Sequence, residues 1–181
     1  LLLTCRQQFA SRYLRALSFA DKFGIRIYID SWNIETTKEY IENYFRHYSS
    51  VEKYMKGLIE SGLETGYATT KYGRKRKVLE LKSANYNTRM FGERVAMNMP
   101  IQGTAADIMK IAMNNLYKKF KELNLEAKII MQVHDELLVE AKDSEVEIVK
   151  ETMKEVMESA VKLNLPLEAD VNVGLSWMEA K

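Results

Sequence analysis

Two short segments rich in isoleucine, leucine and valine, residues 127–133 and 137–140, are separated by only three polar residues, His-Asp-Glu at 134–136. Runs of this composition are typical of buried β-strands. A connection this short permits only an antiparallel pair of strands. The sequence therefore predicts a tight β-hairpin with a charged turn, which restricts the fold more than any other feature.

Helical patterns surround this hairpin. Residues 89–99 and 104–123 predict a long helix that Pro100 bends or divides, because proline removes one backbone donor from the helix interior. A helix at residues 143–163 and a final strand at residues 167–173 follow the hairpin. This order predicts an α+β fold, in which an antiparallel sheet of the hairpin and the C-terminal strand packs on long helices.

The N-terminal half has its clearest helix start at Thr36, where Glu39 three residues later completes a capping box. Aromatic and aliphatic residues then recur at helical spacing up to Gly62. We predict that this stripe packs in the core. Stacking of nucleic-acid bases on the aromatic rings is the alternative.

A second, shorter hairpin is predicted around Lys71-Tyr72-Gly73-Arg74-Lys75-Arg76-Lys77, since the segments 66–70 and 78–81 flank a turn-forming Tyr-Gly pair. We expect its tip to carry four consecutive cations. A tip of this kind faces either phosphates or water.

Composition narrows the class of protein. The chain has 181 residues, of which 46% are hydrophobic and 29% charged, and none of its apolar runs reaches the roughly 18 residues needed to cross a bilayer. The start does not match a signal peptide, and a lone Cys5 excludes an internal disulfide, so we expect a cytoplasmic protein. The absence of an initiator Met suggests a piece of something longer.

Charge is unevenly distributed, although the net charge is only +2. Residues 1–90 carry 16 Lys/Arg and 9 Asp/Glu, whereas residues 91–181 carry 11 and 16. A basic half is compatible with a polyanionic partner, and an ordinary solvated surface explains it about equally well.

The charged turn at residues 134–136 is the candidate site of chemistry. A solvated turn is one interpretation. The other is a metal site, because a rigid hairpin fixes the direction of Asp135 and Mg²⁺ binds carboxylate oxygens while keeping several waters. Phosphoryl transfer by two metals requires carboxylates from different elements, so Asp135 alone does not hold such a pair.

Several motifs resemble one family. Met131-Gln132-Val133-His134-Asp135-Glu136 is similar to the third sequence motif of family A DNA polymerases, the bacterial DNA polymerase I group, and residues 93–107 are similar to the long palm helix of that family. The likeness continues through Gly66-Tyr67, residues 72–76, residues 171–174 and Trp177, and covers about residues 36–181. It implies the closing part of the fingers followed by the C-terminal portion of the palm.

The resemblance makes Asp135 a ligand of the catalytic metals, with Glu136 as its acidic neighbour and His134 beside the primer terminus. It implies a two-metal Mg²⁺ site in the complete enzyme, for which Mn²⁺ substitutes. Its implied partners are primer-template DNA and a dNTP. These are properties of a nucleotidyltransferase of DNA replication or repair.

The same resemblance places Arg94, Asn98 and Gln102 along the duplex near the primer end. Their spacing of four puts them on one face of a helix, where polar side chains suit the nearly sequence-independent acceptors of the minor groove. Capping of the break at Pro100 is the alternative role for Asn98 and Gln102. Arg74 and Arg76 are expected to contact the phosphate backbone.

The first 35 residues depart from the family, which needs a second metal-binding Asp on an earlier palm strand, in a motif of the form Asp-Tyr-Ser-Gln-Ile-Glu. Asp30 begins a partial match and is a candidate third metal ligand. In the competing interpretation, which we favour, Phe23 to Tyr28 are a disturbed fingers helix, with Arg15 at the expected Arg offset and Phe19 in place of a nucleotide-binding Lys.

These features predict three segments: a divergent N-terminal segment at 1–35, a fingers remnant of helix plus basic hairpin at 36–88, and the C-terminal palm portion at 89–181. The expected function is that of a fragment of a template-directed DNA polymerase, inactive or weakly active alone. The alternative is a noncatalytic nucleic-acid-binding module derived from a polymerase palm. A two-metal nuclease would need a further carboxylate cluster.

Overall fold

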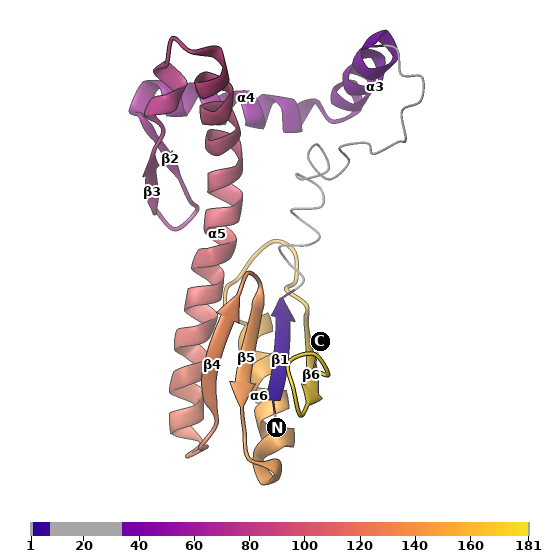
Figure 1. The fold of residues 1–181 in the computed structure, drawn as a ribbon, viewed down its shortest axis with the longest axis vertical. Coiled ribbons are helices and arrows are strands. Elements are labelled where there is room, and N and C mark those ends of the chain that lie inside the picture. The colour runs from indigo at the N-terminus through magenta and orange to yellow at the C-terminus, as the bar shows by residue number, and fades with distance from the viewer. Residues whose placement is uncertain (1, 8–33, 181) are drawn as a thin grey trace. The chain divides into compact units, whose positions relative to one another are not determined.

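The computed structural model describes residues 2–7 and 34–180, and the side chains of residues 2–5 and 41–180. The described elements are β1 (Leu2–Gln7), α3 (Ile34–His47), α4 (Ser49–Thr65), β2 (Tyr67–Thr69), β3 (Lys75–Lys77), the 3-10 helix η1 (Leu79–Lys82), α5 (Tyr86–Glu122), β4 (Lys128–Val133), β5 (Glu136–Glu140), the 3-10 helix η2 (Asp143–Glu145), α6 (Val146–Glu158) and β6 (Ala169–Gly174) (Figure 1). They form two compact units. The sheet unit comprises residues 2–7 and 105–180, and the helical unit comprises residues 34–104.

The sheet unit is built on four strands in the order β4-β5-β1-β6, all paired antiparallel. The predicted hairpin is present: β4 and β5 are joined by His134 and Asp135, with Val133 opposite Glu136. The predicted C-terminal strand is β6. The fold is therefore α+β, as the order of elements predicts.

The centre of this sheet holds a strand that the sequence patterns do not predict. β1 lies between β5 and β6, with Leu3 opposite both Val139 and Val173. The first 35 residues are predicted to be a divergent segment, yet their opening strand completes the palm-like sheet. The run Leu1–Leu3 was a usable signal, because a short apolar run without helical periodicity is also typical of a fully buried strand.

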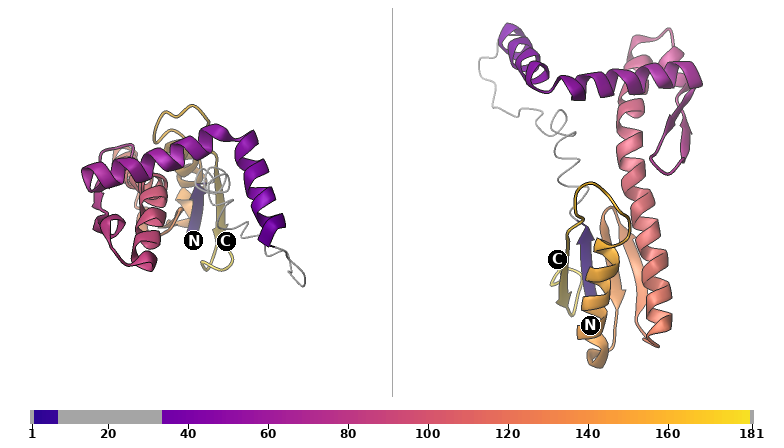
Figure 2. Two further views of the ribbon diagram at one scale, coloured as in Figure 1. Left: turned by 90° about the horizontal axis from the view of Figure 1, so that it is seen from above. Right: turned by 180° about the vertical axis from the view of Figure 1, so that it is seen from behind.

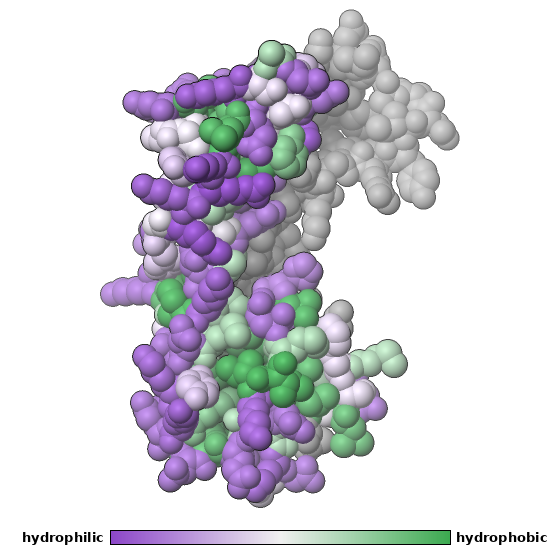
Figure 3. Space-filling view, turned by 60° about the vertical axis from the view of Figure 1, so that its left-hand side comes forward, coloured by the Kyte–Doolittle hydropathy of each residue, from purple (hydrophilic) through white to green (hydrophobic). Residues whose placement is uncertain are grey.

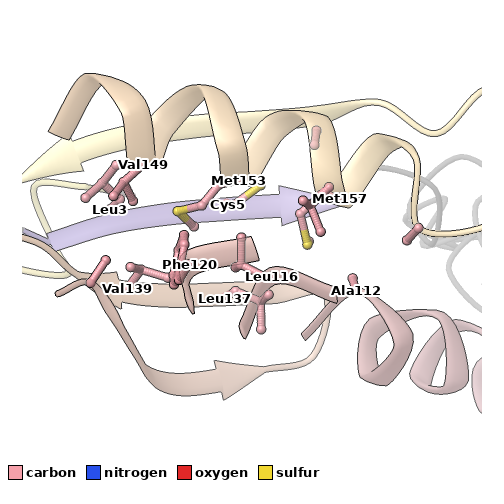
Figure 4. Close-up of a cluster of buried hydrophobic side chains, with 14 of the residues drawn as sticks. Leu3, Cys5, Ala112, Leu116, Phe120, Leu137, Val139, Val149, Met153 and Met157 are labelled. Carbon is pink, nitrogen blue, oxygen red and sulfur yellow. The ribbon is translucent and has the colours of Figure 1, made fainter. Parts of the chain in front are cut away.

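One hydrophobic core fills the space between the sheet and two helices. Leu3 and Cys5 of β1 point toward α6, whose Val149, Met153 and Met157 pack against them (Figure 4). Leu116 and Phe120 of α5, with Leu137 and Val139 of β5, complete the labelled cluster, and α6 lies across the sheet in Figure 2. The helices therefore cover one face of the sheet.

The opposite face of β1 is covered by the C-terminal turn, residues 176–180. Thr4 alternates with Leu3 and Cys5, so its side chain lies on the other side of the strand. It is nevertheless buried, and its hydroxyl donates a hydrogen bond to the carbonyl of Ala180, which is itself buried. The C-terminal turn thus packs over the central strand.

In the helical unit, α4, η1 and the first turns of α5 pack closely around Leu81. A Cβ at Gly62 would lie 2.7 Å from the Leu81 Cδ1, and a Cβ at Gly92 would lie 2.7 Å from the Leu81 backbone nitrogen. Leu81, Val78, Ala68 and Ala96 form the small buried cluster of this unit. Only glycine permits the approach of the two helices to η1.

Two helical predictions differ from the structure. α5 runs from Tyr86 to Glu122, so Pro100 does not divide it. A single proline removes only one donor, and the Thr104 hydroxyl adds a hydrogen bond to the Pro100 carbonyl. The predicted helix from Thr36 to Gly62 is instead two helices separated at Tyr48, and α3 begins before Thr36.

The described aromatic residues of this stripe are not buried in a core, contrary to the prediction, whereas Ile59 near its end packs against the small buried cluster. Tyr48 and Tyr54 are 56% and 48% exposed, and Gly62 is the one buried residue among the described side chains of α4. Tyr44 instead contacts Phe45 edge to face and Tyr48 at a tilt, with ring centroids 5.4 and 5.0 Å apart. In the described part of the chain, no helix is both long enough and apolar enough to cross a membrane.

Candidate active-site turn and nucleic-acid interface

The acidic turn, residues 134–136, connects β4 to β5 through two residues. His134 has a φ of +52°, a left-handed conformation that non-glycine residues adopt at a cost. The Gln132 side-chain amide donates a 2.7 Å hydrogen bond to the His134 carbonyl, which holds the turn in place. His134 is exposed, whereas Asp135 and Glu136 are half-buried. The predicted position of Asp135 in a hairpin turn is confirmed, but with less exposure than expected.

The strand beside this turn is β1. Arg6 lies opposite Glu136 on one side and opposite Asp170 on the other. Directly opposite residues of antiparallel strands share one face of the sheet. At the end of the sheet next to Asp135, the strand register therefore places the cationic residue Arg6 between two acidic residues, Glu136 and Asp170.

The described residues do not fit a two-metal site. Within 2–7 and 34–180 there is no group of three or more His, Cys, Asp and Glu side chains that could hold an ion. The resemblance implies an earlier palm strand bearing Asp, but the strand beside the hairpin ends in Thr4-Cys5-Arg6-Gln7 and has no carboxylate. Asp135 and Glu136 remain as the two candidate ligands in this part of the chain.

The other candidates fall in the N-terminal segment. Asp30, the possible third ligand, lies outside the described residues. The same is true of Phe23 to Tyr28, Arg15 and Phe19, on which the competing fingers interpretation depends.

Cys5 is not a substitute ligand. The pKa of its thiol is raised to about 12, mainly by burial and also by the negative charges of Glu158 and Asp170, while Lys154 acts in the opposite direction. A metal ligand must be the thiolate. At neutral pH Cys5 is a protonated core side chain.

In the helical unit, α5 presents two different faces. Arg94, Asn98 and Gln102 are all exposed, as the prediction of a duplex-facing row requires. The opposite face of the helix, about half a turn around its axis from this row, packs toward η1 and the second hairpin. It carries Gly92, Ala96 and Gly103. In the described structure no hydrogen bond joins Asn98 or Gln102 to the backbone around Pro100, so the capping role has no support.

The basic hairpin, residues 67–77, consists of β2 and β3 joined by residues 70–74. Three of its four consecutive cations, Lys75 to Lys77, lie along β3 and not at the tip as predicted. All of them are exposed, as are Lys71 and Arg74, and Figure 3 shows hydrophilic side chains projecting from this unit. The Lys75 ammonium lies 5.9 Å from the centre of the Tyr67 ring.

The turn of the basic hairpin is fastened to α5. The Arg74 Nη2 donates a 2.7 Å hydrogen bond to the Gly103 carbonyl, and the Lys71 backbone N–H donates one of 2.9 Å to the Thr104 hydroxyl. Thr70 is buried against the helix, where a Cβ at Gly103 would lie 2.6 Å from its Cγ2. The sequence offered no signal for this contact, because it joins residues about 30 positions apart.

The four-stranded sheet with its acidic turn, the exposed polar row on α5 and the basic hairpin agree with the palm and fingers elements that the resemblance implies. The chain belongs to DNA polymerase family A, whose family model matches residues 16–179.

Relatives agree with this assignment. The chain is 45% identical over 171 residues to the DNA polymerase I of Caldicellulosiruptor bescii and 42% identical over 174 residues to that of Bacillus subtilis, which covers 92% and 94% of the chain. A solved structure, the POL domain of Pol1 from M. smegmatis in complex with DNA primer-template and dNTP, matches 99% of the chain at a TM-score of 0.85 and 29% identity.

The chain is much shorter than these proteins. It spans 20% of the length of both curated relatives and 40% of the solved chain. It is thus a fragment-sized member of the family.

Proposed function

We propose that this chain is a duplex-binding fragment of a cytoplasmic DNA polymerase, whose complete protein transfers nucleotides from dNTPs to a primer 3′ end. The observation that carries the proposal is the exposed row of Arg94, Asn98 and Gln102 in the same compact unit as five exposed cations of the basic hairpin. The solved POL domain was captured with primer-template and dNTP, which supports both as partners.

The row on α5 suits the minor groove. Arg94, Asn98 and Gln102 can all donate hydrogen bonds, and the groove offers acceptors at equivalent places on every base pair. Such contacts test the geometry of a base pair without reading its sequence. The hairpin cations add phosphate contacts, which fix the position of the duplex.

Binding can be tested with a labelled primer-template by fluorescence anisotropy at two salt concentrations. Affinity should fall steeply with salt, because each neutralised phosphate releases counterions. Gln102→Ala and Arg94→Gln should weaken binding, whereas Lys150→Gln on the exposed side of α6 should not. Absence of binding at low salt, or an affinity that salt does not change, would refute the proposal.

The catalytic role is proposed for the complete protein. There, Asp135 and Glu136 would be among the ligands of a two-metal Mg²⁺ site, with Mn²⁺ as a substitute, and His134 would lie beside the primer terminus. In this chain the strand next to Glu136 carries no carboxylate, so the described residues do not assemble the second set of ligands. This observation favours the alternative, a noncatalytic nucleic-acid-binding module, for the chain alone.

Primer extension distinguishes the two functions. We expect no incorporation, or only trace incorporation, of a single nucleotide with Mg²⁺ or Mn²⁺. Robust extension that both Asp30→Ala and Asp135→Ala abolish would show that Asp30 supplies the missing ligand. Such a result would mean that the chain alone has nucleotidyltransferase activity.

A further inference from the structure

Arg74 and Arg76 have the same charge and lie two residues apart on the basic hairpin, but their surroundings differ. Arg76 lies within β3 opposite the buried Ala68, whereas Arg74 belongs to the turn that precedes this strand. The Arg74 guanidinium is bonded to the Gly103 carbonyl at 2.7 Å. Among the described residues, no hydrogen bond or ion pair engages the Arg76 side chain. Only one of these arginines is therefore built into a contact between hairpin and helix.

The turn that carries Arg74 is itself preformed. The Arg74 N–H donates to the Thr70 hydroxyl at 3.1 Å, and the Thr70 N–H donates to the Arg74 carbonyl at 2.9 Å. Gly73 closes the turn with a φ of +85°, which glycine adopts without strain. Moving the Arg74 side chain toward a ligand would therefore break its bond to α5 without releasing the turn.

The contacts that join this turn to one short stretch of α5 include the Arg74 hydrogen bond to Gly103, the Lys71 hydrogen bond to Thr104, and the packing of Thr70 on Gly103. A hairpin held in this way loses little further freedom when a ligand binds. Preorganisation of this kind increases affinity without adding a contact.

We propose that Arg74 is a positioning residue of the nucleic-acid interface, which ties the basic hairpin to α5 so that Lys71, Lys75, Arg76 and Lys77 contact phosphates. This inference rests on the proposed duplex binding and revises the role that the sequence alone suggests for Arg74. It assigns two functions to two similar arginines.

The salt dependence of binding separates the two roles. Removing a phosphate contact flattens the slope of log affinity against log salt by about 0.9. We expect Arg76→Gln to flatten the slope by about this amount for a labelled primer-template. Arg74→Gln should instead lower affinity by roughly threefold to tenfold at every salt concentration and leave the slope unchanged, since the net contribution of a typical intramolecular hydrogen bond lies on this scale.

Two further variants test position without charge. Gly103→Ala leaves every cation in place but pushes Thr70 away, and it should reproduce the parallel loss of affinity caused by Arg74→Gln. Arg74→Lys keeps the charge but has no planar guanidinium, and it should not restore binding. Full recovery with lysine, or a slope for Arg74→Gln as flat as that of Arg76→Gln, would overturn the positioning role.

Hydrogen exchange separates failure of this inference from failure of the proposed function. In the protein without DNA, Arg74→Gln should accelerate exchange of the Lys71 amide, whose bond to Thr104 closes the contact. Arg76→Gln should not. If the chain does not bind DNA but the Lys71 amide responds as expected, the proposed function fails while the structural role of Arg74 between the basic hairpin and α5 stands. Unchanged exchange of the Lys71 amide in Arg74→Gln would show that Arg74 does not hold the basic hairpin on α5.

Discussion

Gly103 and Thr70 are so close that a single added Cβ on the glycine would lie 2.6 Å from the threonine Cγ2. Real side chains essentially never approach to this distance, so an alanine must push the basic hairpin away from α5. Thr70 is buried and hydrogen-bonded within its own turn, which limits how far it can yield. The approach of the two elements therefore depends on glycine at this position.

We predict that Gly103→Ala lowers the free energy of unfolding by about 1–3 kcal/mol, the usual cost of overpacking. Gly57→Ala is the matched control, because Gly57 is also within a helix but a Cβ added there would have nothing within 4 Å. It should raise the free energy of unfolding by about 0.5–1 kcal/mol through helix propensity. Urea denaturation of both variants measures the difference, and equal effects of the same sign would contradict the close approach.

A second prediction concerns the hydrogen bond between the Thr4 hydroxyl and the Ala180 carbonyl. Thr4→Val keeps the shape of the side chain but leaves a buried carbonyl without this donor, which should cost about 1–3 kcal/mol. Thr152→Val is the control, since the Thr152 hydroxyl bonds to the Ile148 carbonyl within α6, which also has its helical partner. A loss of stability in thermal unfolding that is the same for both variants would show that the C-terminal turn does not depend on Thr4.

Features set by local pattern were predictable from the sequence. The acidic hairpin follows from two apolar runs with a short polar connection, and the exposed row on α5 follows from a spacing of four. The fold class follows from the order of these elements. Each depends on residues close together in the chain, where periodicity and turn chemistry decide the outcome.

Features set by distant contacts were not predictable. β1 pairs with residues at least 130 positions away, and its apolar start indicates a buried strand but not the strands with which it pairs. The aromatic stripe of α3 and α4 has core-like spacing, but the spacing does not reveal whether another element covers it. The cations of β3 were expected at a tip because the sequence does not show where the turn begins.

A third prediction tests the core of the sheet unit. Leu116 of α5 is fully buried in the cluster that α6 and the sheet complete, so Leu116→Ala should lower the free energy of unfolding by about 2–5 kcal/mol. Leu175 is 79% exposed, and Leu175→Ala should change it by less than about 0.5 kcal/mol. Denaturant titration followed by circular dichroism gives both values. Similar values for the two variants would mean that α5 does not pack on the sheet.

The last prediction follows from the buried thiol of Cys5, whose pKa is raised to about 12 from a reference of 9.0. Well below pH 9 the thiol is protonated in both the folded and the unfolded chain, so it contributes no pH dependence there. Between pH 9 and 12 the unfolded chain loses this proton while the folded chain keeps it. The free energy of unfolding should therefore fall as pH rises through this window, by at most about 1.4 kcal/mol per pH unit.

Comparison with Cys5→Ala isolates this effect, because lysines and tyrosines titrate over the same range in both proteins. The stability of the wild-type chain relative to the variant should be constant from pH 7 to about 8.5 and should decline above pH 9, as measured by urea denaturation. A thiol-specific reagent should label Cys5 slowly in the folded protein and rapidly in urea, since reaction requires exposure and the thiolate. Equally rapid labelling without urea would show that β1 does not hold Cys5 inside the core.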